Sequence, residues 1–234
     1  MAFSENDFLK VEYTAWRIAD GKIVYTTDDA LAKKEEIFDE NVKYGPQLVV
    51  LKSKGMMKGM KRELLGMSVN EVKKFELEPA DAFGERNSDM VRVMSINDFR
   101  KRDIEPYPGM KLDLDGSIAT IKSVNSGRVV VDANHPLAGE RLRYELKVIG
   151  KVDGNKEKAE ELMRHYDLKG KVSGIDKGVM SVDVEDAKDT AEYFANKATF
   201  VNSALDYIDG ISKIRITEEY AKKQNEEKPQ SNES

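Results

Sequence analysis

Residues 55–67 read Gly-Met-Met-Lys-Gly-Met-Lys-Arg-Glu-Leu-Leu-Gly-Met, and residues 68–84 read Ser-Val-Asn-Glu-Val-Lys-Lys-Phe-Glu-Leu-Glu-Pro-Ala-Asp-Ala-Phe-Gly. In the first half, apolar side chains recur at helical spacing and predict a short helix with one Met-rich face, which Gly66 ends. In the second half, Val72, Phe75 and Leu77 predict a strand with one buried face. A short helix laid across a twisted antiparallel sheet forms a groove for an apolar ligand. The alternative is that the methionines, which fill irregular interiors well, are core residues only.

The composition excludes several classes of protein. The chain of 234 residues is long enough for about two domains. Its net charge is −5, with basic residues scattered among acidic ones, so we expect no nucleic-acid partner. It has no cysteine and only two histidines, so we expect no disulfide, no thiol chemistry, no metal site and no cofactor. No long apolar run predicts a membrane segment or a leader peptide, and we expect a cytoplasmic protein.

The residues around this stretch predict the rest of a sheet, which we assign to residues 1–85 and 133–152. A hairpin turn is expected at Asp20-Gly21, and residues 28–40 read as a polar loop with a helical turn. Strands are predicted at residues 10–18, 23–26, 48–51 and 142–149.

Residues 86–132 interrupt that pattern with a small β-rich unit. Ser95 is a candidate N-cap for a short helix that carries Phe99. Asp115-Gly116 and residues 125–127 are hairpin signals. Strands are predicted at residues 90–93, 111–114, 118–121 and 128–131.

A third unit follows at residues 153–218, in the order helix, strand, strand, helix, strand. This order predicts a small α+β domain. Its second helix is expected to place Phe194, Ala198, Val201, Leu205 and Ile208 on one face. Units of this size often gain stability by pairing, so a homodimer through this domain is one expectation. Residues 219–234 are polar and predict a disordered tail.

Several short motifs resemble one known family. In chain order they are Tyr13-Thr-Ala, Asp20-Gly21 with Ile23-Val-Tyr-Thr-Thr27, the helix from Gly59-Met60 to Gly66-Met67, Ala82-Phe83-Gly84, and Asn134-His-Pro-Leu-Ala-Gly139 before Leu142-Arg-Tyr144. The chain resembles the FKBP-type peptidyl-prolyl isomerases, in the SlyD-like subtype whose isomerase domain is interrupted by an insert-in-flap chaperone domain. The C-terminal unit is similar to the dimerisation domain of archaeal long-type members. The resemblance implies an α+β fold: a twisted antiparallel FKBP sheet with a short helix, the β-rich insert, and a C-terminal α+β domain.

The chemistry that the resemblance implies fits the scarcity of Cys and His. Rotation of an X–Pro bond must overcome amide resonance, a barrier of roughly 18–20 kcal/mol, and needs no nucleophile or metal. An apolar cleft lowers this barrier by binding the twisted, less polar amide better than the planar one.

The resemblance also implies which residues form the cleft. Its catalytic positions would be Tyr13, Tyr25, Phe83 and Tyr144. Its substrate-binding positions would be Val24, Met56, Met57 and Met60, with Leu137 and Ala138 approaching from the flap. From the pattern alone, Tyr13 and Tyr144 fit buried strand aromatics equally well, and His135 reads as a turn residue rather than a catalyst.

The chain departs from the family at two of these positions. The family usually has Phe-Asp where this chain has Val24-Tyr25, and Tyr where it has Phe83. Loss of one hydroxyl hydrogen bond, at about 0.5–1.5 kcal/mol, would lower the rate about two- to tenfold. We therefore expect measurable but reduced isomerase activity and weak binding of macrolide inhibitors.

The insert carries more Met and aromatic residues than so small a unit readily buries. Such a surface suits unselective binding of unfolded chains. The candidate client-binding residues are Val91, Val93, Met94, Phe99, Tyr107 and Met110; the alternative is that some of them form the insert's own core. The predicted function is a prolyl isomerase and folding chaperone acting on unfolded, proline-containing polypeptides. The alternative function is a holdase chaperone with weak or lost isomerase activity.

Overall fold

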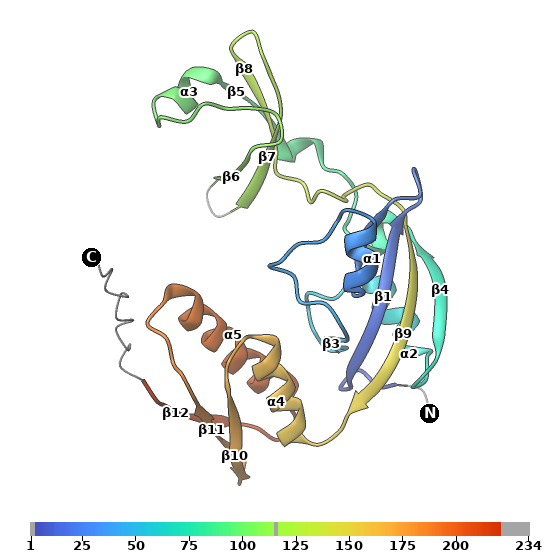
Figure 1. Ribbon diagram of the computed structural model, residues 1–234, viewed down its shortest axis with the longest axis vertical. Helices are drawn as coiled ribbons and strands as arrows, with labels where there is room; N and C mark the ends of the chain where they lie inside the picture. Colours follow the sequence, from blue (N-terminus) through green and yellow to red (C-terminus); the bar gives the residue numbers. More distant parts are fainter. Residues whose placement is uncertain (1–2, 115–116, 221–234) are drawn as a thin grey trace, which may run out of the picture.

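The computed structural model describes residues 3–114 and 117–220, and the chain forms three parts (Figure 1). The main sheet contains β1 (Phe8–Arg17), β2 (Ile23–Thr26), β3 (Gln47–Val50), β4 (Val72–Leu77) and β9 (Leu142–Val152). Its strand order is β2-β1-β9-β4, with β3 also paired to β1. The β-rich insert and the C-terminal module lie at opposite ends of this sheet (Figure 1). The insert is joined to it by the segments that follow β4 and precede β9, and the C-terminal module follows β9.

The long central pair of strands determines the shape of the main sheet. β1 and β9 run antiparallel from the Phe8–Val152 pair to the Arg17–Leu142 pair, with one bulge after Lys10. All pairings in this sheet are antiparallel. The α+β fold class with a twisted antiparallel sheet and a short helix is therefore confirmed.

Two short helices flank the main sheet. α1 (Asp29–Lys34) begins at Asp28, whose side chain accepts hydrogen bonds from the first-turn amides. α2 (Lys58–Leu65) is the predicted helix, and Gly66 ends it as the sequence predicted. It is shorter than the predicted Met-rich face, because it contains Met60 whereas Met56, Met57 and Met67 lie outside it. At Gly59 of α2, an added Cβ would collide with the side chain of Leu77 on β4. Glycine at this position therefore lets α2 approach the sheet closely. A 3-10 turn, η1 (Pro79–Asp81), follows β4.

The insert, residues 86–132, has its own sheet and its own core. After the 3-10 turn η2 (Ser88–Met90) come β5 (Val91–Ser95), α3 (Ile96–Arg100), β6 (Lys111–Leu114), β7 (Ser117–Asn125) and β8 (Arg128–Asp132). The strand order is β5-β8-β7-β6, all antiparallel. Ser95 caps α3 as predicted. The hairpin expected at Asp115-Gly116 lies outside the described residues.

The C-terminal module, residues 153–218, packs onto the main sheet. It consists of α4 (Asn155–His165), β10 (Gly170–Asp176), β11 (Val179–Val184), α5 (Ala191–Tyr207) and β12 (Lys213–Glu218). β11 pairs antiparallel with β10 and parallel with β12. Its core cluster also takes in Phe8, Val50 and Val152 from the main sheet. Phe8 is fully buried there, so the two parts share one apolar interior.

The long helix α5 turns inward a face that only partly matches the expected one, in which Ile208 is 2% exposed and Val201 packs against the core cluster. It buries Tyr193, Phe200 and Ala204, whereas Phe194 and Leu205 remain 43% and 38% exposed. The sequence carries two apolar stripes on this helix, and the pattern alone does not show which one meets the sheet.

Two expectations concern parts of the chain beyond these elements. Most of the predicted disordered tail, residues 221–234, lies outside the described residues. Among the helices of residues 3–114 and 117–220, none has both the length and the apolar character needed to cross a membrane.

Candidate functional site

Tyr144 of β9 lies at the centre of an aromatic cluster on the core face of the main sheet. Its side chain is 1% exposed. Its ring lies 6.0 Å from Tyr13 of β1 and stacks on Phe75 of β4 at 5.6 Å. Alternation along these adjacent strands directs all three rings to one face.

The methionines of the helix region meet this cluster from the other side. Met57, the residue at the start of α2, receives a weak hydrogen bond from the Tyr144 hydroxyl at 3.8 Å (O to Sδ). Met60 is 5% exposed and belongs to the same apolar cluster, and Met56 packs against it. The sequence left open whether these methionines line a groove or fill the core. In the structure Met56, Met57 and Met60 all belong to or pack against one apolar cluster.

Burial disfavours ionisation of the two tyrosine hydroxyls, which are neutral at physiological pH even when exposed to water. It raises the pKa of Tyr144 well above its ordinary value, with smaller contributions from Tyr13 and Tyr25. It also raises the pKa of Tyr13. Both phenols therefore retain their protons at physiological pH and can act as hydrogen-bond donors.

A row of three rings borders the cluster on the flap side. Phe83, which follows η1, stacks face to face on His135 with ring centres 4.0 Å apart and planes 2° apart. On its other side Tyr25 of β2 lies 6.1 Å away and is 42% exposed. Sequence reasoning treated His135 only as a turn residue, because its partner Phe83 lies 52 positions earlier in the chain.

The flap loop, residues 134–139, is folded back on its own side chains. The backbone N–H of Leu137 donates to Nδ1 of His135 at 3.1 Å, so the neutral ring carries its proton on Nε2. Partial removal of its ring from water lowers the pKa of His135 below its ordinary 6.5, although the residue as a whole is exposed. Leu137 itself is 8% exposed and belongs to the cluster of Met60 and Tyr144.

The structure therefore brings most of the expected cleft residues together. Eight of them lie in or against one apolar cluster: Tyr13, Val24, Met56, Met57, Met60, Phe83, Leu137 and Tyr144. Tyr25 reaches this cluster through Phe83. Ala138 is buried, but it is not part of the cluster.

A separate cavity of about 930 Å³ lies where Trp16, Phe38, Tyr44 and Val72 meet. Its lining from β1 comes mainly from Glu12, Thr14 and Trp16, which alternate with the core residues of that strand. Apart from Tyr13, none of the expected cleft residues borders it.

The candidate client-binding residues of the insert fall into three groups. Met94, Phe99 and Met110 border a cavity of about 320 Å³, together with Ile104 and Leu112. Val93 and Tyr107 stand out into solvent, 64% and 60% exposed. Val91 is half-buried. Phe99 is only 4% exposed, so most of its ring serves the insert's own core.

Sequence reasoning missed Ile118 of β7, which at 73% is the most exposed of the insert's large apolar residues that the structure describes. The alternation of the predicted strand could have indicated its exposure, because Ile118 lies on the opposite face from the buried Ala119 and Ile121. The described residues hold no group of three or more His, Asp and Glu side chains placed to bind a metal ion.

Comparison with known proteins agrees with this geometry. Residues 2–93 match the family model of FKBP-type peptidyl-prolyl cis-trans isomerases, and residues 92–137 match that of the FKBP26 IF domain. The short-type peptidyl-prolyl cis-trans isomerase of Methanocaldococcus jannaschii is 29% identical over 144 residues, which is 62% of this chain and 90% of that protein.

Two bacterial relatives extend the likeness. The FKBP-type 16 kDa peptidyl-prolyl cis-trans isomerase of Escherichia coli is 32% identical over 109 residues, covering 44% of this chain and 72% of that protein. The SlyD isomerase of Helicobacter pylori is 27% identical over 135 residues, covering 56% of this chain and 72% of that protein. The aromatic and methionine cluster thus lies in a chain that belongs to the FKBP-type peptidyl-prolyl cis-trans isomerase family.

Proposed function

We propose that this isomerase turns X–Pro bonds in unfolded client proteins that its insert holds beside the cleft. The observation that carries the proposal is the convergence of Tyr13, Met57, Met60, Phe83 and Tyr144 on one apolar surface, bordered by the flap loop. The flap loop follows directly on the last strand of the insert. A cytoplasmic location remains a prediction from the sequence.

The cleft acts on the substrate by binding rather than by covalent chemistry. A prolyl ring and its twisted amide fit an apolar surface better than the planar, more polar ground state does. The hydroxyls of Tyr13 and Tyr144, which are protonated at physiological pH, are the donors available in the cluster. Withdrawing the amide from water lowers the resonance barrier because the charge-separated planar form loses solvation.

Within this proposal the cleft residues have two roles. Tyr13, Tyr25, Phe83 and Tyr144 orient the amide and face its twisted form. The prolyl ring lies against the apolar side chains, which are Val24, Met56, Met57, Met60, Leu137 and Ala138. With Phe83 in place of a tyrosine, the ring stacked on His135 supplies shape but no hydroxyl.

The insert supplies the client site. Met94, Phe99 and Met110 border its apolar cavity. Val93 and Tyr107, on the same unit, are exposed to solvent. Flexible methionines adapt to many apolar partners. A client bound there raises the effective concentration of its prolines at the cleft.

The first test separates catalysis from capture. Isomerisation of an X–Pro tetrapeptide is measured by NMR exchange with the intact chain and with a chain whose residues 86–132 are replaced by a short linker. Both are expected to accelerate the tetrapeptide, because the insert has a core of its own. Only the intact chain is expected to accelerate proline-limited refolding of a protein.

A pair of charge variants tests whether the reaction takes place in the cleft. Met57→Glu puts a carboxylate beside Tyr144 and is expected to abolish tetrapeptide isomerisation. Lys54→Glu puts the same group on a nearby exposed position and is expected to leave it intact. Full activity of Met57→Glu would place catalysis elsewhere. No acceleration by any chain, with aggregation still suppressed, would favour the holdase alternative.

The proposed homodimer would use the outer face of α5. Phe194, Ala198 and Val201 border a cavity of about 420 Å³ together with Ile216 of β12. Phe194→Glu in the full chain is expected to give monomers by analytical ultracentrifugation, whereas Glu192→Gln on the same helix keeps the dimer. A monomeric wild-type chain would refute the dimer.

A further inference from the structure

The insert shares no core cluster with the rest of the chain among the residues that the structure describes. The clusters of the main sheet and of the C-terminal module contain none of the described residues between 86 and 132. Two chain segments join the insert to the main sheet, residues 84–91 on the way in and residues 132–139 on the way out (Figure 1). The orientation of the insert therefore depends on what links these two segments.

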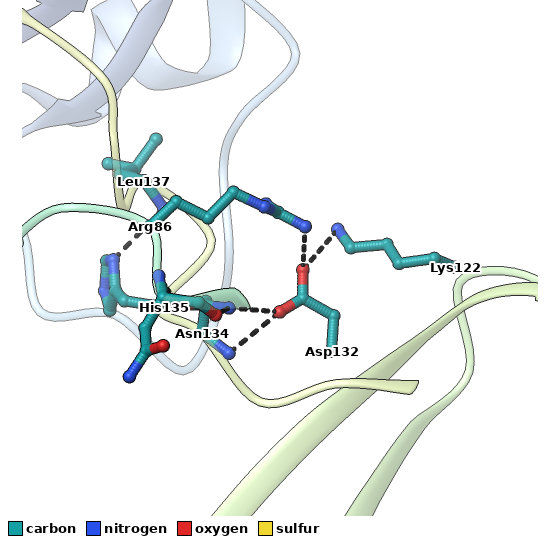
Figure 2. A network of polar contacts seen from close by, with 7 residues as sticks. Arg86, Lys122, Asp132, Asn134, His135 and Leu137 are labelled. Atoms are coloured by element: carbon teal, nitrogen blue, oxygen red, sulfur yellow. Dashed lines mark hydrogen bonds and ion pairs between the residues drawn. The ribbon is translucent and has the colours of Figure 1, made fainter. Parts of the chain in front are cut away.

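A buried carboxylate stands at this junction. The Asp132 side chain is 2% exposed at the end of β8. It accepts hydrogen bonds from the backbone N–H of Asn134 at 3.0 Å, from Nδ2 of Asn134 at 2.7 Å, and from the guanidinium of Arg86. Nζ of Lys122 lies 3.9 Å away (Figure 2). Burial alone would raise the pKa of Asp132, but the hydrogen bonds from Asn134 and the charge of Arg86 outweigh it and lower the pKa below 3.8.

Asn134 extends the contact across both segments. Its Oδ1 accepts from the backbone N–H of Asn87 at 2.8 Å, and its Nδ2 donates to the Asn87 carbonyl at 2.9 Å. The side chain of Asn134 thus binds both polar groups of one peptide position on the incoming segment. Arg86, Asn87, Asp132 and Asn134 together form what we call the hinge network.

Backbone hydrogen bonds on either side reinforce the hinge network. The Ala133 N–H donates to the Met90 carbonyl at 3.0 Å, and the Gly139 N–H donates to the Gly84 carbonyl at 2.9 Å. A buried charge is costly unless several donors satisfy it, and a flexible tether has no need of one. The donors around Asp132 and Asn134 tie the two connecting segments to each other where they leave the insert.

The hinge network also adjoins the cleft. His135, the residue after Asn134, stacks on Phe83, and Leu137 belongs to the cleft cluster. Figure 2 shows His135 and Leu137 beside the hinge network. We infer that Asp132 and Asn134 are positioning residues for the reaction on protein substrates: through the hinge network they hold the insert at one angle to the cleft, so that a bound client presents its X–Pro bonds there. The inference rests on the proposed binding of clients by the insert.

The orientation can be measured directly because the chain has no cysteine of its own. Cysteines at exposed Lys34 on α1 and Glu105 in the insert carry spin labels, and the distance distribution between them is recorded by pulsed electron spin resonance. Asp132→Asn removes the buried charge at constant shape. Arg86→Met removes the arginine that pairs with Asp132. Because Arg86 lies outside the insert's core, this variant still tests the inference if Asp132→Asn fails to fold. Asp103→Asn is the matched control on an exposed position of the insert.

The same variants are compared in two reactions, proline-limited refolding of a protein and isomerisation of a tetrapeptide. Asp132→Asn and Arg86→Met are expected to broaden the distance distribution and to lower kcat/KM for the protein roughly threefold or more, because the effective concentration of client prolines falls. Their tetrapeptide rates are expected to equal that of Asp103→Asn. A general loss of structure would lower both reactions together.

Two outcomes would overturn the inference. One is a distance distribution as narrow in both variants as in the control. The other is a broadened distribution with unchanged catalysis on the protein substrate. A wild-type chain that refolds the protein no faster than the chain without the insert overturns the proposed function and the inference with it. This failure of the proposed function is detected by comparing the wild-type chain with the chain without the insert, so it can be distinguished from a failure of the inference about the hinge network.

Discussion

The stack of Phe83 on His135 makes a quantitative prediction about the cleft. The two substitutions are Phe83→Leu, which keeps apolar volume but removes the ring, and His135→Asn. Asparagine can still accept the Leu137 N–H, because Asn side chains bond the backbone two residues on. The pair therefore removes the ring contact from each side while it preserves the fold of the flap loop.

The size of the effect follows from the geometry. Aromatic pairs contribute about 0.5–1.5 kcal/mol beyond their buried area. Phe83 is half-buried and His135 is exposed, so we expect the lower half of that range, about 0.5–1 kcal/mol. At 1.4 kcal/mol per factor of ten, this is about a two- to fivefold change. If the stack orients Phe83 for the substrate, kcat/KM for a tetrapeptide falls by the same factor in His135→Asn.

The assay is a double-mutant cycle. Urea unfolding gives the coupling energy from the wild type, both single variants and the double variant. His165→Asn, an exposed histidine on α4, serves as the matched control and should add independently to Phe83→Leu. A coupling below about 0.3 kcal/mol for the Phe83–His135 pair would refute the stack as a stabilising contact. Unchanged catalysis in His135→Asn would refute its role in orienting Phe83.

Three further predictions concern activity, pH and stability. Phe83→Tyr restores a hydroxyl and should raise tetrapeptide kcat/KM about two- to tenfold; no gain would mean that the substrate is out of the hydroxyl's reach. Since the folded pKa of His135 lies below the unfolded 6.5, its contribution to stability is complete above about pH 6.5 and declines as pH falls towards the folded pKa. NMR titration of the His135 ring checks this, and a midpoint at or above 6.5 would contradict it. Phe8→Ala should cost about 3–5 kcal/mol and lower the protection of main-sheet and C-terminal amides together in hydrogen exchange; protection lost in only one of them would show that they do not share a core.

The sequence was most informative where one pattern had one solution. Around Met60 the helical spacing, the closing Gly66 and the strand that ends at Leu77 agree with one another, and the structure has α2 and β4 there. The expectation for Val72 was wrong, because at 52% exposed it lies on the opposite face of β4 from Phe75 and Leu77. The turns at Asp20-Gly21 and at residues 125–127 followed from turn residues in the same way, and the small sheets followed from alternation. The family resemblance then collected distant residues such as Tyr13 and Tyr144 into one expected cleft, which periodicity alone could not have done.

The sequence was least informative where a pattern fits two partners. On α5, Phe194 and Phe200 lie on different apolar stripes, and which of them meets the sheet is decided by packing. The burial of Phe8 against the C-terminal module is a contact between units that no local pattern encodes. The hinge network is built from polar residues in connecting segments, where polarity ordinarily indicates exposure. Only the fold shows that Asp132 is buried and paired.

The order of strands along the chain also determines the order in which the protein can form during translation. The central pair of the main sheet joins β1, near the beginning, to β9, which leaves the ribosome only after the whole insert has been made. The insert's own pairings connect β5 to β8 over a short span of chain and can close as soon as Asp132 has emerged. Local contacts form faster than distant ones. The unit proposed to bind clients is therefore complete while the main sheet still lacks a central strand, so the proposed client site forms before the proposed cleft does.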